Sequence, residues 1–311
     1  MERYLDPKAD LTFKRVFGEH PDLVRSFLNA LLPLEAGEEI ERVEYLPAEL
    51  VPENPLRKNS IVDVRCRDNR GRQFIVEMQM AWSPEFRQRV LFNAAKAYVR
   101  QLGKGLDYGL LEPVYSLNLV NDVMDAGLPG YYHSYRMVHE AYSDRVIEGL
   151  RLVFIELPKF TPSTFAEKRM HVLWLRYLTE VGENKPSVAP ELLSDPEVGK
   201  ALSEIRASAF TDAELAGYDK FWDQVSVEVT LYNSGERKGR AEGRAEGLVE
   251  GRAEGLAEGR AEGRVEGLAE GRLEGERQKA LEIARKLKAL GQSFAEIASL
   301  TGLSSEDVER I

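Results

Sequence analysis

The chain has 311 residues, a formal net charge of −10, 43% hydrophobic and 30% charged residues, and one cysteine. This composition excludes a disordered chain and an internal disulfide, and the length accommodates one large domain with an appendage. No stretch approaches the roughly 20 apolar residues of a membrane helix, and the first residues show no apolar signal core, so we expect a cytoplasmic protein with no membrane contact.

The first part of the chain is predicted to be helical over residues 10–33. Phe13, Val16 and Phe17 share one helical face. Asp10 is a candidate N-cap, and it lies four residues from Lys14, a spacing typical of a surface ion pair. Residues 40–51 then contain a strand candidate, which we expect to pair with the segment that follows.

Residues 58–80, KNSIVDVRCRDNRGRQFIVEMQM, are predicted to form a β-hairpin with strands at 61–67 and 73–80. A three-residue loop with Gly71 in the left-handed conformation pairs Asp68 with Arg72. Counting back from that pair places Asp63 directly opposite Glu77. Alternate side chains share a face of a strand, so two sets share an apolar face. These sets are Val62, Val64 and Cys66, and Phe74, Val76, Met78 and Met80.

Two carboxylates on directly opposite strand positions repel each other unless a cation lies between them. Mg²⁺ accepts one or two carboxylates together with waters and substrate phosphates. The alternative is a solvated polar face in which the pair arises by chance. The surrounding charge favours the metal site, because residues 57–104 hold eleven Lys or Arg against four Asp or Glu. A local excess of positive charge beside a metal site is typical of a surface that binds a polyanion.

A helix is predicted from Ser83 to about Leu102, followed by strands at 113–120 and 150–157 with a loop between them. Residues 163–232 are expected to form a helical cover for the sheet. The four histidines lack zinc-ligand spacing, and neither a phosphate-binding Gly-Lys loop nor a serine nucleophile elbow is present. The candidate DNA-binding cations are Arg65, Arg67, Arg87, Arg89, Lys96 and Arg100.

These patterns together resemble the Rpn family of recombination-promoting nucleases, also labelled transposases, within the PD-(D/E)XK nucleases. Gln79 stands where a lysine is more common in the wider group. The resemblance extends from residue 1 to about residue 235. It is carried by Asp63, Glu77-Met78-Gln79, Asp10-Leu11-Thr12-Phe13-Lys14, Arg89, Tyr98 and Glu156-Leu157-Pro158-Lys159-Phe160.

The resemblance implies a restriction-endonuclease-like α/β fold over residues 1–234, with a mixed sheet flanked by helices. It implies a DNA endonuclease that promotes recombination, acts in defence against mobile DNA, and uses Mg²⁺, with Mn²⁺ or Ca²⁺ as substitutes. Asp63 and Glu77 are the expected metal ligands, and Gln79, Asp10 and Lys14 the further catalytic residues. Two alternatives stay open: a non-catalytic partner-binding protein on the same fold, and a nuclease that cleaves RNA.

The composition changes at Gly235, after which glycine recurs at every fourth position, eleven times, up to Gly275. Four residues advance roughly 400° around a helix, so a column of glycines drifts and forms no fixed stripe. Each glycine costs about 0.5–1 kcal/mol relative to alanine in a helix. We therefore expect a marginal helix in isolation, serving as a linker or a self-association stalk over residues 235–275.

Residues 276–311 return to ordinary helical patterning. A helix over 276–290 is predicted to end at Gly291, Ser293 and Glu296 form a capping box, and Ser304 caps a last short helix. The unit resembles a helix-turn-helix, but its last helix begins with acidic residues, which favours a protein partner over DNA. We expect a homo-oligomer formed through the stalk and these helices, and the resemblance implies that C-terminal pieces regulate the nuclease.

Overall fold

The computed structural model describes residues 2–50, 60–103, 105–162, 169–183, 185 and 187–311. The chain divides into two compact units, Met1–Leu231 and Tyr232–Ile311. The boundary falls within one long helix, α7 (Asp212–Ala289). The finer division into 1–234, 235–275 and 276–311 stays a prediction.

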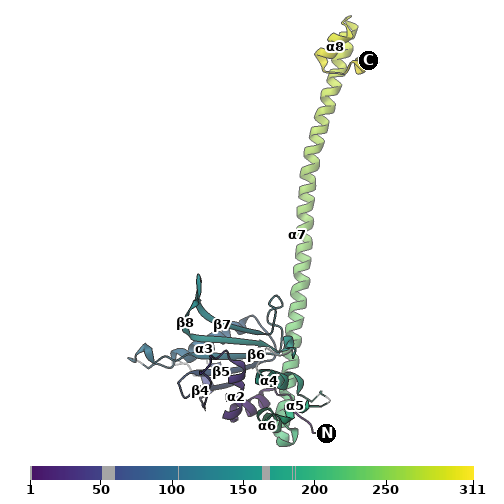
Figure 1. Ribbon diagram of the computed structural model, residues 1–311. Coiled ribbons are helices and arrows are strands. Elements are labelled where there is room, and N and C mark those ends of the chain that lie inside the picture. The colour runs from purple at the N-terminus through teal and green to yellow at the C-terminus, as the bar shows by residue number, and fades with distance from the viewer. Residues whose placement is uncertain (1, 51–59, 104, 163–168, 184, 186) are drawn as a thin grey trace. The chain divides into compact units, whose positions relative to one another are not determined.

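A six-stranded mixed sheet forms the centre of the first unit, in the order β1-β4-β5-β6-β8-β7 (Figure 1). The pairs β5–β6 and β6–β8 are parallel, and the other neighbours are antiparallel. Every residue of β6 is buried, as expected for a strand covered on both faces. The strands are β1 (Val43–Tyr45), β4 (Val64–Asp68), β5 (Gln73–Gln79), β6 (Val114–Val120), β7 (Tyr132–His139) and β8 (Tyr142–Glu156).

The predicted register of the β4–β5 hairpin is confirmed. Cys66 lies opposite Phe74, and the Asp68 N–H donates to the Arg72 carbonyl over 3.0 Å. Gly71 adopts a φ of +88°, a conformation that favours glycine. The buried Asp68 carboxylate accepts the backbone N–H and Nε of Arg72, over 3.0 and 2.7 Å, so side-chain bonds also hold the turn.

The predicted strand at 61–67 is interrupted by a bend at Asp63, which corrects the sequence analysis. Its first part, β3 (Ser60–Ile61), pairs with β2 (Glu49–Leu50) in a separate two-stranded sheet. Val62 therefore packs with Leu50 and Ile75, whereas Val64 packs in the core on the other face of the sheet. The prediction that Val62 shares a face with Val64 is wrong, because period-two alternation fails across a bend.

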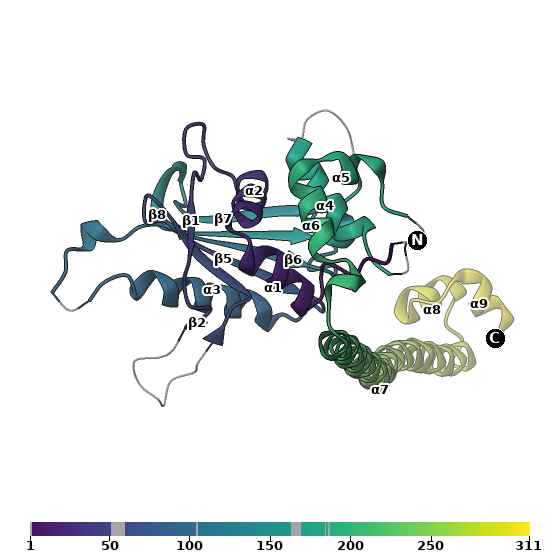
Figure 2. The ribbon, with the colours of Figure 1, turned by 90° about the horizontal axis from the view of Figure 1, so that it is seen from below.

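Helices cover the two faces of the sheet (Figure 2). On one face, α1, α2 and α4 pack around Trp174, which contacts the rings of Phe17 and Phe27. On the other face, α3 packs over Ile75 and Phe154 with its apolar stripe. The helices of this unit are α1 (Asp10–Glu19), α2 (Pro21–Leu31), α3 (Glu85–Val99), α4 (Arg169–Glu180), α5 (Pro190–Ser194), α6 (Pro196–Glu204) and the start of α7.

Two local expectations in this unit are also corrected. Asp10 is the first residue of α1 and the cap position is Ala9, so Asp10 is not the N-cap, although its ion pair with Lys14 forms at 2.7 Å. The predicted loop between the strands at 113–120 and 150–157 contains β7 and the first half of β8. This outer hairpin is exposed on both faces, so it lacks the apolar alternation that indicates a strand. Residues 163–168 of the predicted helical cover lie outside the described residues.

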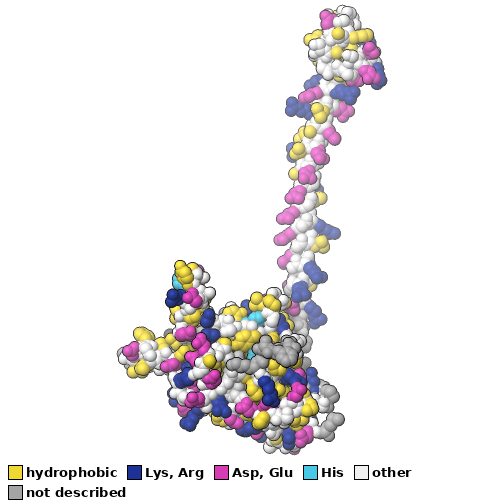
Figure 3. Space-filling model, in the orientation of Figure 1, with side chains coloured by type: hydrophobic (Ala, Val, Ile, Leu, Met, Phe, Trp, Pro, Cys, Tyr) yellow, Lys and Arg dark blue, Asp and Glu magenta, His cyan; other side chains and the backbone are white. Residues whose placement is uncertain are grey.

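The second unit consists of the remainder of α7 and two short helices. Residues 235–275 lie inside α7, and no separate helix begins at Glu276, contrary to the prediction. Side chains of both charges and scattered hydrophobic side chains line the exposed repeat (Figure 3). The predicted capping box joins Ser293 and Glu296 at the start of α8 (Phe294–Thr301). Ser304 caps α9 (Ser305–Arg310), as predicted.

A small core of Ala284, Ile297 and Val308 holds the terminal helices of the second unit to the end of α7. Among the described helices of the whole chain, none has the length and apolar composition required to cross a membrane.

Candidate active site

A cavity of about 850 Å³ lies between the bend at Asp63, strand β5 and helix α3. Glu77 and Gln79 are two residues apart on β5 and so project to the same side of the sheet. The cavity brings together Asp63, Glu77 and Gln79, which the sequence analysis selected as catalytic. Its lining also includes Ser60, Ile61, Met78, Ser83, Glu85, Phe86, Gln88, Arg89, Phe92 and Asn93.

Glu77 is a buried carboxylate with an unfavourable neighbour. Its side chain is 7% exposed, and Oε1 accepts a hydrogen bond from Nδ2 of Asn93 over 3.0 Å. Burial, and then the nearby Asp63 carboxylate, raise the pKa of Glu77 from its ordinary value of 4.5 to about 7. Arg89 acts in the opposite direction and favours the charged form. The site thus holds two carboxylates that repel each other in a partly desolvated space.

Asp63 sits at the bend that ends the β4 ladder. Its Oδ2 accepts the Met78 N–H over 2.7 Å. Met78 lies past the last residue pair of the β4–β5 ladder, so the Asp63 carboxylate takes the place of a carbonyl of β4 as the acceptor. Burial raises the pKa of Asp63, and the hydrogen bond from Met78 together with Lys14 and Arg89 lowers it. The bend places this carboxylate beside β5 and within the field of both α1 and α3.

Asp10 and Lys14 approach this site from α1 but do not line its cavity. Both act electrostatically on Asp63, Lys14 lowering and Asp10 raising its pKa. Their mutual ion pair is about half exposed. They line a neighbouring cavity of about 590 Å³, between α1 and the first turns of α7.

Gln79 is held at both ends of its amide group. Its Oε1 accepts a hydrogen bond from Nη2 of Arg89, and its Nε2 donates to the Ala81 carbonyl over 2.7 Å. The Arg89 guanidinium also lies 4.7 Å from the centre of the Phe86 ring. Of the six predicted DNA-binding cations, Arg89 is the one that lines the cavity.

The other five predicted cations lie around α3 and along the hairpin. Lys96 is at the cavity rim, where its Nζ donates to Ser60 Oγ over 3.2 Å. Arg87 lies 3.7 Å from Asp125, and Arg100 follows the last residue of α3. Arg65 donates to Gln73 on β5 over 2.8 Å, and Arg67 pairs with Glu44 on β1 at 3.0 Å, so neighbouring strands of the sheet engage both guanidinium groups.

Asn93 is a site residue that the sequence analysis missed. It is 1% exposed and lies on the buried stripe of α3, where every other buried residue is apolar. Its Oδ1 has no hydrogen-bond partner within the described residues. A polar residue within the apolar stripe of a predicted helix can be recognised in the sequence. This signal selects Asn93 once α3 is known to pack over the strand that carries Glu77.

The donors in this cavity fit a hard divalent cation. Asp63 and Glu77 supply carboxylate oxygens, and Gln79 and Asn93 supply amide oxygens, which are the ligand types that Mg²⁺ prefers. The unpartnered Asn93 Oδ1 can accept a hydrogen bond from a metal-bound water. Within the described residues no group of three or more His, Cys, Asp or Glu side chains forms a metal site. Any cation here would therefore keep several waters or substrate oxygens.

The raised pKa of Glu77 predicts a pH-dependent stability of the metal-free protein. As pH rises from about 4.5 to about 7, the unfolded chain loses this proton before the folded chain does, so the free energy of unfolding falls. The Glu77→Gln substitution removes this pH-dependent contribution to the free energy of unfolding. In EDTA, we expect the free energy of unfolding of the variant, relative to that of the wild type, to rise by about 2–3 kcal/mol between pH 4.5 and pH 8. Urea unfolding at both pH values measures this gain, and an unchanged difference would contradict the prediction.

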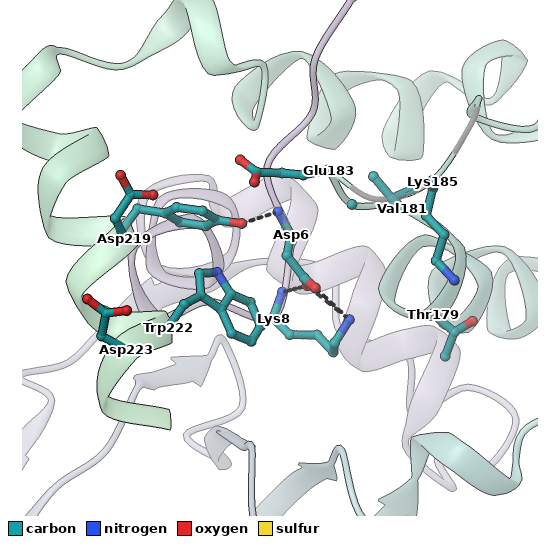
Figure 4. A pocket seen from close by; sticks show the side chains of 11 residues that line it. Asp6, Lys8, Thr179, Val181, Glu183, Lys185, Asp219, Trp222 and Asp223 are labelled. Atoms are coloured by element: carbon teal, nitrogen blue, oxygen red, sulfur yellow. Dashed lines mark hydrogen bonds and ion pairs between the residues drawn. The ribbon is translucent and has the colours of Figure 1, made fainter. Parts of the chain in front are cut away.

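A third cavity, of about 560 Å³, lies beside the first turns of α7 (Figure 4). Tyr218 accepts the Asp6 N–H over 2.9 Å, and Lys8 forms an ion pair with Asp6 at 2.9 Å. Lys8 Nζ also donates to the Leu178 carbonyl over 3.0 Å. These groups satisfy one another and join the N-terminal segment to α4 and α7, which indicates a structural contact and not a phosphate site.

Comparison with known proteins agrees with this geometry. A family model described as PD-(D/E)XK nuclease family transposase matches residues 7–226, which contain the whole sheet and the carboxylate cavity. A mixed sheet flanked by helices fits the PD-(D/E)XK nuclease fold, so the resemblance inferred from the sequence is confirmed. A search of curated proteins and a search of solved structures found no match.

Proposed function

The chain belongs to the PD-(D/E)XK nuclease family transposases, and from this premise we propose that it is a divalent-metal-dependent endonuclease that cleaves DNA. Family membership supports a nuclease-type hydrolase in general. The observation that carries the finer proposal is the Asp63–Glu77 pair, which shares one cavity with Arg89. A role in recombination and in defence against mobile DNA belongs to the same proposal.

The charged side chains of the cavity favour binding of a cation, and the bound cation would in turn favour binding of a phosphate. A divalent cation would offset the Asp63 and Glu77 carboxylates when both are ionised, and the other charged groups of the lining, Glu85 and Arg89, are of opposite sign. The cation and the Arg89 guanidinium would then both attract the negative charge of a phosphodiester. Asp63 and Glu77 would hold Mg²⁺, or Mn²⁺ or Ca²⁺ in its place. When bound, such an ion lowers the pKa of a coordinated water and offsets charge that develops on the phosphate.

The remaining side chains have separate proposed roles. Asn93 holds Glu77 in place through its hydrogen bond to Oε1. Gln79, itself held by Arg89, orients the attacking water or a phosphate oxygen, and Arg89 donates to the phosphate. Because Gln79 is neutral, positive charge from Arg89 and from Lys14 on α1 substitutes for the lysine common at this position.

DNA contacts outside the cavity are proposed for cations near its rim. Lys96 lies on α3 beside the cavity, so it is placed to contact the phosphate next to the scissile one. The other proposed contacts, made farther along α3 and the hairpin, are those of Arg65, Arg67, Arg87 and Arg100.

Incubation of the full chain with supercoiled plasmid tests the activity. With Mg²⁺ or Mn²⁺ we expect nicked or linear DNA, because the two carboxylates lack a counter-charge without the metal. EDTA should stop the reaction and excess Mg²⁺ should restore it. A transcript of the same sequence serves as the RNA comparison. Cleavage that persists in EDTA would reject the metal-dependent mechanism, and cleavage of the transcript alone would favour the RNA alternative.

Self-association through α7 is a second proposal, carried by the surroundings of its glycines. At each of the eleven glycines from Gly235 to Gly275, an added Cβ would meet no heavy atom of the described chain within 4 Å apart from the adjacent residues and the neighbouring backbone of α7 itself. Contacts inside the chain therefore do not require glycine, although each one weakens the helix. Close approach by the α7 helix of a second copy is a reason for these glycines. The same proposal assigns regulation of the nuclease to the terminal helices. Light scattering of the full chain, whose monomer is 35.1 kDa, tests this proposal.

A further inference from the structure

Two large apolar side chains stand exposed at the rim of the carboxylate cavity. Ile61, on β3, is 67% exposed, and Phe92, on α3, is 46% exposed. Both contribute to the lining of the same cavity as Asp63 and Glu77. An exposed aromatic side chain that is continuous with a catalytic cavity is a candidate contact for the substrate itself.

Phe92 lies between two cations on the same side of α3. Arg89, Phe92 and Lys96 are spaced at i, i+3 and i+7, so they are neighbours along one helical face. Lys96 Nζ lies 5.5 Å from the centre of the Phe92 ring. Arg89 reaches into the cavity and bonds Gln79. An aromatic face between two cations matches a nucleobase between two phosphates, because the base stacks on the ring while each cation faces one phosphate.

A base in an intact duplex cannot offer its face to such a ring, since its neighbours in the stack already cover it. The partner of Phe92 must therefore be a base that has left the stack. We propose that Phe92 stacks on an unpaired nucleobase beside the scissile phosphate, with Ile61 against the other side of that base. The preferred substrate is then DNA with unpaired nucleotides, such as a gap, a bulge or a single strand. This inference rests on the proposed nuclease function and specifies its substrate class.

The test compares Phe92→Ala with Leu91→Ala. Leu91 is the adjacent residue on α3 and is 49% exposed, but it does not line the cavity. The substrates are a paired duplex, the same duplex with one bulged nucleotide, and a single strand. Stacking contributes about 1–3 kcal/mol per base, so Phe92→Ala should lower kcat/KM on the bulged and single-stranded DNA about 5- to 150-fold. We expect less than a twofold change on the duplex, and no change for Leu91→Ala on any substrate.

A binding measurement separates this inference from the proposed function. In a Glu77→Gln background in EDTA, where cleavage is prevented and one of the two carboxylates no longer repels the phosphate, a 2-aminopurine at the bulged position should lose fluorescence when its base stacks on Phe92. Phe92→Trp should keep that loss, and Phe92→Ala should remove it. If the wild type cleaves DNA but Phe92→Ala affects all three substrates equally, the inference is wrong and the nuclease proposal stands. If the wild type cleaves nothing, the nuclease proposal fails, and the 2-aminopurine signal still decides whether Phe92 binds a base.

Discussion

Replacing Asp63 with Asn or Glu77 with Gln is expected to lower the rate of plasmid cleavage at least about a thousandfold. Each substitution preserves the shape of the side chain and removes one of the two charges that would hold the cation. A bound metal supplies several kcal/mol of transition-state stabilisation, and each 1.4 kcal/mol corresponds to about tenfold in rate. Both variants should still fold, because the carboxylates they replace repel each other and have raised pKa values.

Glu85→Gln is the matched control for the carboxylate variants. Glu85 lines the same cavity but is exposed at the start of α3. It should keep wild-type cleavage within about twofold. Calorimetric titration with Mn²⁺ gives a readout other than activity: Asp63→Asn and Glu77→Gln should lose the binding heat, and Glu85→Gln should retain it. Wild-type rates in both carboxylate variants would show that this pair is not the catalytic centre.

Replacing Glu156 with Ala is expected to destabilise the first unit by about 3–5 kcal/mol. Glu156 is fully buried at the end of β8 and acts as a shared acceptor. Its Oε1 lies 2.8 Å from His133 Nε2 and 2.9 Å from Lys159 Nζ. Its Oε2 accepts the Met124 N–H over 2.8 Å. Removing the carboxylate leaves an ammonium group, an imidazole and a backbone donor without this acceptor in the interior.

Urea unfolding followed by tryptophan fluorescence measures this effect, since all three tryptophans lie in the first unit. The control is Glu148→Ala on the same strand. Glu148 is exposed, so its replacement should change the free energy of unfolding by no more than about 0.5 kcal/mol. A loss below about 1 kcal/mol for Glu156→Ala would mean that water replaces the carboxylate and that the cluster does not hold the loop before β7 in place.

Much of the candidate site could be predicted from local sequence rules. The register of the β4–β5 hairpin, from Arg67 opposite Gln73 to Val64 opposite Val76, follows from the left-handed Gly71 and the period of two and needs no long-range information. The capping box at Ser293 and the cap at Ser304 were predictable for the same reason, since a cap depends on residues within one turn.

Other features depend on neighbours far away in the sequence. The bend at Asp63 arises where β3 leaves the main sheet to pair with β2, and no residue of the 61–67 segment signals that change of partner. The β7–β8 hairpin extends beyond the core and is exposed on both faces, so it lacks an apolar pattern. Asn93 becomes a site residue only because α3 packs over β5, which allows the Asn93 amide to donate a hydrogen bond to Glu77.

The sequence by itself therefore determined the hairpin that carries the two carboxylates and the ends of the last helices, and its resemblance to a known family indicated the fold. The hairpin and the helix ends follow from short-range periodicity, turn conformation and capping. Only the tertiary structure decided how deeply the carboxylates are buried, which of the six cations reaches the cavity, and that Phe92 stands at its rim. Burial and electrostatic fields arise from all the elements packed around a group, here α1, α3 and the sheet, and no local pattern contains them.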